Sequence, residues 1–529
     1  MWAPMWNDAV KIESGGRYPL LLNRFHDHME GLLIKGIVSL TDRLRYISYC
    51  CWAIGDIEKT CRLDNYSEFV EAFRRRENAL ALGLYLLKQE DSRYDSYTIY
   101  GSDRLSRVTP DDYGNYNCSF KMMQSVDMGA YELYYGGTMY NWGLVESKDG
   151  IVQLTGAGWR LHDIVAQYYI DTRYYTEYRG EQMVPGEVLM EWAEINSYDN
   201  IIDDFARRER DFYKEIIFRL DETDKVDYRR DTFALFLECI DQCNQANICF
   251  NEDILRNIHY FGRYYDVDGN VVEFQQPDYF SDVIFYWKIY ELHVYFRWWV
   301  LEYFKYFLTV LKSKEGGMTI EAFIDSIDVN SFNNIAKEHL SDDLDYFNME
   351  LKDILNIIEE PTYIDDKYSE ETITLNSGNI DVSGDLAKFV IVMASLYRKF
   401  EVLSDDNRYL SIRGKFVTDY WFDNLFMEFE GIEGMSIAQF LAYVLKKYII
   451  EKHDRAMYEK KDLRRCWFTK ENNRYIFQAD TSSIWRPAKY MTIMRFLFDM
   501  NLIAYSDDIL ELTGEGVELY EYLRGAIYL

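Results

Sequence analysis

A group of cysteines in the middle of the chain could support metal chemistry. Cys239, Cys243 and Cys249 are followed ten residues later by His259. Structural zinc sites use four thiolate or imidazole ligands at short spacings, and this spacing is not that of a zinc finger or ribbon. Cys239 and Cys243 stand at i and i+4 of an expected helix, which suits small buried side chains. We therefore predict buried thiols and assign no metal and no cofactor.

Other catalytic motifs are weaker still. The stretch Asp266-Val-Asp-Gly-Asn-Val-Val-Glu fails the ligand spacing of an EF-hand, so it predicts a β-turn. His26-Asp27-His28 has no third ligand nearby and predicts a surface face of a helix. No GxxxxGK[ST] phosphate loop and no GxSxG motif occur. We assign no catalytic residue, and a diverged metal-dependent nuclease stays open as one alternative.

The charge of the chain limits the partners that it can bind. Its formal net charge is −31, from 89 acidic and 58 basic side chains. Such a field repels a polyanion over about 10 Å at moderate salt, which excludes a general nucleic-acid coat protein. Basic residues mixed with aromatic ones near the C-terminus are the exception, and they form the candidate DNA-binding surface. Its residues are Arg455, Lys460, Lys461, Arg464, Arg465, Lys489, Arg495 and Trp467. Ion pairing with acidic parts of the same chain stays open as the alternative.

A second basic set lies near the N-terminus, at Arg43, Arg45 and Arg74–Arg76. Leu44, Ile47 and later apolar residues follow the first two arginines at helical spacing, with the arginines beside that face. We predict packed, ion-paired helix surfaces here rather than nucleic-acid contacts.

Two stretches share a pattern that would position the candidate residues. In 134–169 a helix end is followed by strands at 142–145 and 151–154, separated by a turn at 148–150 that contains Asp-Gly, and by a helix that opens at Thr155. Asp-Gly between apolar runs is a strong hairpin signal, and threonine is a favoured helix cap. The stretch 491–529 repeats the order, and both copies place Leu-Thr-Gly-x-Gly after the second strand. The pattern predicts two winged helix-turn-helix modules.

The helix before the first predicted wing, about 128–142, is the one that enters the major groove in DNA-binding winged helices. It contains no Arg or Lys, and Arg is the usual reader of guanine. Its aromatic residues favour contact with protein over contact with DNA. The candidate protein-docking residues are Tyr131, Tyr134, Tyr135, Tyr140 and Trp142.

The composition indicates a mainly α-helical, multidomain protein. Among 529 residues there are only 7 prolines, and 48% are hydrophobic. We expect an N-terminal helical region with a polar linker (1–118), a first winged helix (119–170), and a helical middle domain (186–360) with an aromatic helix at 280–312. An acidic linker (361–383), a small helical unit (384–450), and a basic, aromatic approach with the second winged helix (451–529) follow. No membrane span and no secretion signal are evident, so we expect a cytoplasmic protein.

Two phrases carry a resemblance to a known group of proteins. Gly36, a Ser/Thr pair, Arg43-x-Arg45-Tyr46 and Trp52 precede a charged helix at 69–87, and Glu451-Lys-His-Asp-Arg-Ala precedes the C-terminal module. The chain thereby resembles uncharacterised prokaryotic proteins associated with anti-phage defence gene clusters. The resemblance implies a defence setting and a helicase-like or nuclease-like partner, and it implies no activity.

The hypothesis from the sequence is a non-catalytic subunit of a prokaryotic defence complex that binds protein partners, double-stranded DNA or both. A kleisin-like adaptor that bridges a motor ATPase is the alternative from another class, and it rests on architecture alone. The nuclease named above is the third.

Overall fold

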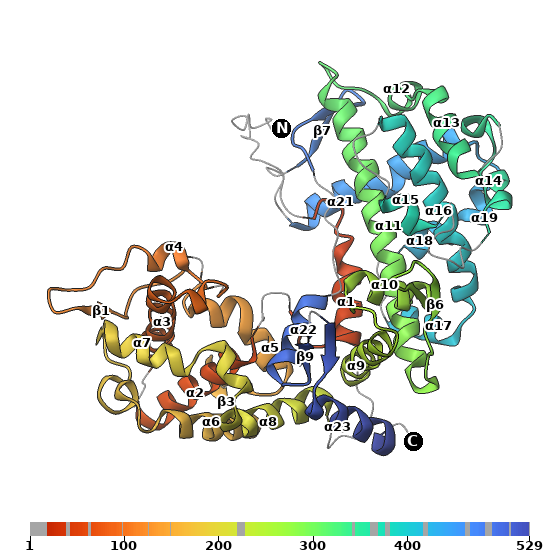
Figure 1. The fold of residues 1–529 in the computed structure, drawn as a ribbon. Coiled ribbons are helices and arrows are strands. Elements are labelled where there is room, and N and C mark those ends of the chain that lie inside the picture. The colour runs from red at the N-terminus through yellow and green to blue at the C-terminus, as the bar shows by residue number, and fades with distance from the viewer. Residues whose placement is uncertain are drawn as a thin grey trace, which may run out of the picture. The chain divides into compact units, whose positions relative to one another are not determined.

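The computed structural model describes residues 18–38, 43–61, 65–97, 99–124, 126–148, 150–219, 228–340, 344–359, 369–375, 381–415, 422–460, 466–481, 489–506 and 509–527. The predicted mainly helical class is confirmed, because the sheets in these residues are all two-stranded (Figure 1). None of the helices described is long and apolar enough to cross a membrane.

The helices, in chain order, are α1 (Asn23–Leu33), α2 (Leu44–Thr60), α3 (Tyr66–Glu90), α4 (Ser102–Leu105), α5 (Gly136–Asn141), α6 (Gly156–Tyr169), α7 (Gly186–Ile195), α8 (Arg207–Phe218), α9 (Arg229–Gln245), α10 (Glu252–Phe261), α11 (Ser281–Lys312), α12 (Ile320–Asp325), α13 (Val329–Leu340), α14 (Leu351–Ile357), α15 (Glu370–Leu375), α16 (Val382–Ser404), α17 (Asn407–Lys415), α18 (Asp423–Phe426), α19 (Phe429–Ile432), α20 (Ile437–Val444), α21 (Glu451–Lys460), α22 (Tyr490–Asp499) and α23 (Gly514–Tyr522). The strands are β1 (Asn115–Asn117), β2 (Val145–Lys148), β3 (Ile151–Leu154), β4 (Met183–Pro185), β5 (Arg263–Tyr265), β6 (Val271–Glu273), β7 (Phe468–Glu471), β8 (Arg474–Phe477), β9 (Ile503–Ser506) and β10 (Ile509–Leu512). Each strand pairs antiparallel, β1 with β4 and the others with their neighbour in the chain.

The chain forms two compact units, and each is built from two separate stretches. Unit 1 comprises 1–30 and 251–487, and unit 2 comprises 31–250 and 488–529. The predicted segment 451–529 therefore contributes to both units. Most of the predicted linker 361–383 lies outside the described residues.

Unit 1 is organised around the aromatic helix α11. This helix packs against α10 and α16, and its large side chains, such as Trp287, Trp299 and Tyr303, are fully buried. Burial of such aromatic surface is the main source of stability in a helical unit. The helix predicted at 280–312 is present as α11 and is buried. The predicted middle domain 186–360 is not one unit, because residues 186–250 belong to unit 2 and residues 251–360 to unit 1.

Two details of unit 1 bear on the sequence predictions. Asp266 forms the predicted turn between β5 and β6, because its carboxylate accepts hydrogen bonds from the backbone N–H groups of Asp268 and Asn270 at 2.9 and 2.7 Å. The prediction of a surface face for His26 is wrong. His26 is fully buried, with its ring 4.8 Å from those of Tyr290 and His293, because this side of α1 packs on α11.

The core of unit 2 lies between α2, α3, α6 and α7. Trp52 of α2 and Trp192 of α7 are fully buried with ring centroids 5.0 Å apart, and both contact Tyr169 of α6. The helices α3 and α7 approach so closely that a Cβ on Gly83 would lie 2.1 Å from the carbonyl oxygen of Leu189. A glycine is required at this crossing.

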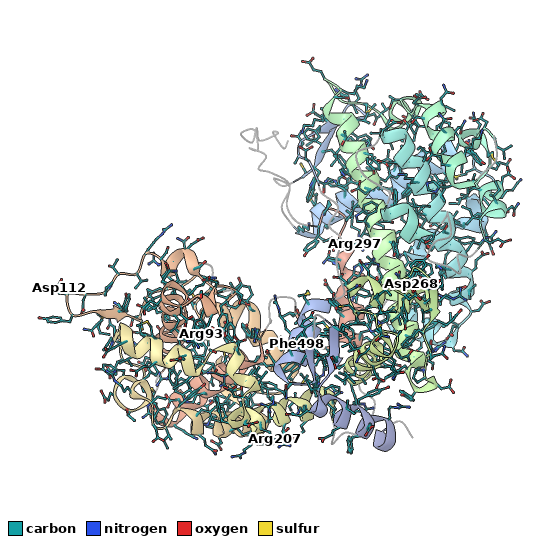
Figure 2. All side chains as sticks on the ribbon, in the orientation of Figure 1. Arg93, Asp112, Arg207, Asp268, Arg297 and Phe498 are labelled. Carbon is teal, nitrogen blue, oxygen red and sulfur yellow. The ribbon has the colours of Figure 1, made fainter. Side chains whose placement is uncertain are left out.

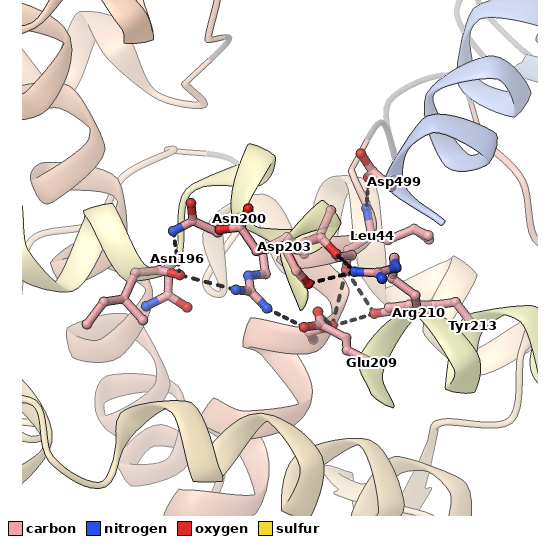
Figure 3. A network of polar contacts seen from close by, with 12 residues as sticks. Leu44, Asn196, Asn200, Asp203, Glu209, Arg210, Tyr213 and Asp499 are labelled. Carbon is pink, nitrogen blue, oxygen red and sulfur yellow. Dashed lines mark hydrogen bonds and ion pairs between the residues drawn. The ribbon is translucent and has the colours of Figure 1, made fainter. Parts of the chain in front are cut away.

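Ion pairs form, as predicted, at Arg43, Arg45, Arg75 and Arg76, and the pairs of Arg45 and Arg76 are buried. Arg45 pairs with Glu209 of α8 and also donates to the carbonyl of Ile195 at 3.2 Å. Ser48 donates to the same carboxylate and lies 2.7 Å from the hydroxyl of Tyr213 (Figure 3). The hydroxyl of Tyr213 in turn donates to the carbonyl of Leu44 at 2.8 Å.

A second buried pair joins α2 to α3. The guanidinium of Arg76 donates to the carboxylate of Asp56 at 2.7 and 2.9 Å, and both side chains are buried. The prediction of ion-paired helix surfaces is therefore confirmed at Arg45 and Arg76, and these guanidinium groups are out of reach of a nucleic acid.

Arg45→Met tests the importance of the buried pair to unit 2. The variant leaves the Glu209 carboxylate buried without its counter-charge, so the free energy of unfolding should fall by about 3–5 kcal/mol. Hydrogen exchange of the α2 amides in increasing urea measures this change. Arg160→Met is the matched control, because Arg160 pairs with Glu215 at 2.6 Å while 57% exposed. That change should cost at most about 1 kcal/mol. Equal effects of the two variants would contradict the prediction.

Candidate functional site

The first predicted module is a helix–hairpin–helix unit within unit 2. A π-helical turn (Tyr131–Tyr135) continues into α5, and the chain then enters the β2–β3 hairpin and α6. Gly143 takes a positive φ of 69° at the end of the first helix, and the N–H of Leu144 returns to the carbonyl of Met139 at 2.9 Å. This turn sets the direction in which the hairpin leaves the helix.

Thr155 closes the first unit. Its hydroxyl accepts a hydrogen bond from the N–H of Gly158, which caps α6, and donates to the carbonyl of Gly143 at the end of α5. One side chain therefore joins the start of the second helix to the end of the first, across the base of the hairpin.

The second helix–hairpin–helix unit, formed by α22, β9, β10 and α23, repeats these contacts 358 residues later. Asn501 takes a positive φ of 55°, and Leu502 N–H returns to the carbonyl of Leu497 at 2.9 Å. Thr513 accepts from the N–H of Gly516 and donates to the carbonyl of Asn501. The shared Leu-Thr-Gly-x-Gly element thus has the same hydrogen bonds in both copies.

The second glycine of this element is required by close packing. A Cβ on Gly158 would lie 2.1 Å from the carbonyl oxygen of Leu144, and one on Gly516 would lie 2.0 Å from that of Leu502. At the first glycines, Gly156 and Gly514, a Cβ would meet nothing within 4 Å.

Each hairpin is supported by a helix from a distant part of the sequence. Strand β3 packs on α2, and strand β10 packs on α9. Asp499 at the end of α22 accepts a hydrogen bond from the N–H of Leu44 at 2.8 Å and pairs with Arg43 at 3.0 Å. These contacts fix both helix–hairpin–helix units on the helical core of unit 2.

Helix α8 connects the two helix–hairpin–helix units. Its Glu215 pairs with Arg160 of α6, and its Arg210 and Lys214 pair with Glu515 of α23. These bonds, with one from Asn501, lower the pKa of Glu515 to about 2 although burial acts in the opposite direction. The carboxylate of Glu515 is therefore a charged anchor for the second unit.

The helix before each hairpin presents an outward face to solvent. In the first helix–hairpin–helix unit this face consists of Leu133, Gly137 and Tyr140. The side chains of Leu133 and Tyr140 are 42% and 65% exposed. In the second helix–hairpin–helix unit the equivalent positions are occupied by Met491, Arg495 and Phe498. Phe498 (Figure 2) is half-buried and stacks on Tyr505 of β9, with ring centroids 5.4 Å apart.

The structure places most of the predicted docking residues inside unit 2. Tyr131, Tyr135 and Trp142 are buried, and Tyr134 is half-buried and stacked on Tyr100. The three buried side chains contact the core helices α3, α2 and α8 and are not available to a partner. Tyr140 is the one member that is exposed.

The candidate DNA-binding residues do not share one compact unit. Arg455 and Lys460 lie on α21 in unit 1. In unit 2, Lys489 directly precedes α22 and Arg495 lies on it. Lys461, Arg464 and Arg465 lie outside the described residues.

Several of the candidate DNA-binding side chains already have partners in the protein. Lys489 donates to the carbonyl of Ile37 at 2.7 Å, and Lys460 to that of Tyr18 at 2.7 Å. Trp467 is buried and cannot stack on a base.

The cysteine cluster does not come together as a ligand set. Cys239 and Cys243 are buried in α9, as predicted, and burial raises the pKa of the Cys243 thiol to about 12. His259 belongs to unit 1, where its ring stacks on that of Trp287 at 5.0 Å. In the part of the chain that the structure describes, no three His, Cys, Asp or Glu side chains are placed to hold a metal ion.

Comparison of the chain with models of protein families, with curated proteins and with solved structures finds no match. The function is therefore inferred from the geometry above.

Alanine at the four glycines of the Leu-Thr-Gly-x-Gly elements tests the shared geometry. Gly158→Ala and Gly516→Ala should each lower the free energy of unfolding by about 1–3 kcal/mol, because the added methyl group overlaps a carbonyl oxygen. Gly156→Ala and Gly514→Ala are the matched controls and should leave stability unchanged or raise it by up to about 1 kcal/mol. Urea denaturation measures the free energy of unfolding of the four variants. Equal changes at Gly156 and Gly158, or at Gly514 and Gly516, would contradict the shared geometry.

Glu515→Gln tests the charged anchor through the pH dependence of stability. The folded-state pKa of about 2 lies below the ordinary value of 4.5, so the contribution of Glu515 is complete above pH 4.5 and is lost as the pH falls toward 2. We expect the stability difference between wild type and variant to be largest at neutral pH and to shrink over this interval. Thermal unfolding at a series of pH values measures it, and a constant difference would contradict the assignment.

Proposed function

We propose that the two helix–hairpin–helix units are winged-helix modules, and that the chain is a protein-binding subunit of a multiprotein prokaryotic anti-phage defence complex. The observation that carries the proposal is the chemistry of the two outward faces. In winged helices this face contacts the partner. Here it offers the exposed side chains of Leu133, Tyr140 and Met491 and the half-buried Phe498 at equivalent positions of the two copies.

These faces favour protein over DNA. Reading of bases in the major groove uses Arg, Lys, Asn or Gln side chains, and affinity for DNA depends on cations that neutralise phosphates. The first outward face has no such side chain, and the second has Arg495 alone. Exposed aromatic and methionine side chains are enriched at protein interfaces. The formal net charge of −31 further opposes DNA.

The defence setting is supported by the resemblance of the N-terminal and C-terminal phrases described above. The structure adds a physical role for one of these phrases. Arg43 and Arg45 join the start of α2 to α22 and α8, so the phrase holds the scaffold of both modules. A phrase with this role belongs to the fold and is compatible with several partners.

Introduction of a negative charge on the outward faces tests the proposal. The chain is co-expressed with the products of its neighbouring genes, among which the resemblance implies a helicase-like or nuclease-like protein. Tyr140→Asp and Phe498→Asp should each weaken the isolated complex at least about tenfold, because a charge would be buried in an apolar contact. Tyr113→Asp is the control, since Tyr113 is 89% exposed elsewhere on unit 2. Biolayer interferometry with the co-purified protein measures the affinities.

Binding to DNA provides the opposing outcome. We expect a dissociation constant for double-stranded DNA no tighter than non-specific binding, about 10⁻⁴–10⁻⁶ M at physiological salt. Fluorescence anisotropy at several salt concentrations measures it. Tight, salt-dependent binding that is lost in Arg495→Glu, together with no effect of the outward-face variants on the complex, would overturn the proposal.

A further inference from the structure

A buried carboxyl group from α3 lies at the start of the helix that leads into the first hairpin. This helix begins at Gly129 and continues through the π-helical turn into α5. Glu77 of α3 is 1% exposed, and its Oε1 accepts hydrogen bonds from the hydroxyl of Tyr46 at 2.7 Å and from the backbone N–H of Tyr131 at 3.0 Å. Glu77 therefore supplies an acceptor that the first turn of a helix lacks within itself.

Close packing encloses the carboxyl group of Glu77. Gly129 takes a positive φ of 48°, and a Cβ at this position would lie 2.1 Å from Oε2 of Glu77. The ring of Tyr131 packs on that of Phe73 of α3, with centroids 5.4 Å apart. Because these contacts cover it, the carboxyl group reaches water only when the helix start moves away from α3.

The charged and titratable neighbours of Glu77 leave it without a counter-ion. In the part of the chain that the structure describes, Glu77 takes part in no ion pair. Arg74, on the same helix, acts on it from a distance and donates to the backbone carbonyl of Asp127 at 3.2 Å. From α2, Tyr46 and Cys50 face Glu77, and burial raises the pKa of both groups well above their usual values. Both therefore stay neutral at neutral pH, and an ionised Glu77 is the one charge among them.

This environment favours the neutral form of Glu77. Burial raises the pKa of Glu77 to about 7, although the hydrogen bonds from Tyr46 and from the helix start act in the opposite direction. Once the helix start has opened and water reaches the carboxyl group, the pKa returns toward its ordinary value of 4.5. The closed form therefore binds the proton more tightly than the open form, so loss of the proton favours opening.

We propose that Glu77 is a pH-sensitive switch of the first helix–hairpin–helix unit: its neutral form holds the helix start on α3, and its ionised form lets the helix start open. A neutral carboxyl group keeps Oε1 as an acceptor for both donors, whereas an ionised one gains hydration on opening. The described residues between β1 and Gly129 form neither helix nor strand, so no ordered element opposes this movement. The same helix presents Leu133 and Tyr140, so the switch controls the order of the first outward face. The inference concerns the fold of unit 2 and does not depend on what that face binds.

Hydrogen exchange of the full chain between about pH 5.5 and 8.5 tests the switch, with the opening constant of the 134–141 amides obtained after correction for intrinsic exchange. In the wild type this constant should rise about tenfold per pH unit up to about pH 7 and stay level above it. Glu77→Gln is neutral at every pH and keeps a side-chain acceptor, so its opening constant should not change with pH.

Glu132→Gln is the matched control. The carboxylate of Glu132 is exposed and accepts hydrogen bonds at the same helix start, from the N–H groups of Asp127 and Met128 at 2.9 and 3.1 Å. Because water reaches this carboxylate in the closed form, the variant should keep the pH profile of the wild type.

Three results would overturn the proposal: a wild-type opening constant that does not change with pH, the wild-type profile in Glu77→Gln, or a flat profile in Glu132→Gln. The amides of α7, in the core of unit 2, report unfolding of the whole unit and should show smaller opening constants. Equal constants in α7 and in 134–141 would contradict a local switch.

Tyr46→Phe provides a second measurement if Glu77→Gln does not fold. The variant removes a hydrogen-bond donor that favours the ionised form of Glu77, so the opening constant should go on rising above about pH 7. A profile that levels off at the same pH as in the wild type would count against the proposal.

Discussion

The buried pair between Arg45 and Glu209 is the interaction on which unit 2 depends. It joins α2, the helix under the first hairpin, to α8, whose Arg210 and Lys214 pair with Glu515 of α23. Ser48 donates a second hydrogen bond to the Glu209 carboxylate, and the hydroxyl of Tyr213 lies beside that of Ser48. Charges without water are costly unless geometry and hydrogen bonds satisfy them, so such a pair tolerates little displacement. Figure 3 shows that the contacts around it reach Asp499 on α22. The positions of both modules are thereby linked through one polar network inside an otherwise aromatic core.

The two helix–hairpin–helix units share their internal geometry and differ in their outward chemistry. Thr155 and Thr513 form equivalent hydrogen bonds. In each copy a backbone carbonyl group lies so close to the second glycine of the Leu-Thr-Gly-x-Gly element that no side chain fits there. The outward faces have no such constraint, and the second carries an arginine where the first has Gly137. A scaffold used twice with different outward side chains can engage two unlike partners, or two sites on one partner.

Local sequence signals were sufficient to predict the hairpins and their caps, because turn chemistry and capping are decided within a few residues of Thr155 and Thr513. Burial was harder to predict. Tryptophan is frequent in binding surfaces, so Trp142 was predicted to contact a protein partner and Trp467 to contact DNA. Both are buried: Trp142 is covered by helices from distant parts of the chain, and Trp467 packs against His453. The division into units was hidden for the same reason, as both combine stretches far apart in the chain.

The interleaving of the two units has a consequence for biosynthesis. Residues 488–529 complete a unit whose other part ends at residue 250, and the intervening stretch belongs to the other unit. During translation Arg43, Arg210 and Lys214 are made long before their partners Asp499 and Glu515. Contacts of such sequence separation form slowly, so the nascent chain exposes cationic and apolar surface until residues 488–529 have been made. A chain cut short before residue 489 would lose the second module and also the carboxylates of Asp499 and Glu515, which pair with the scaffold of the first module. We expect chaperones and proteases to bind such a chain.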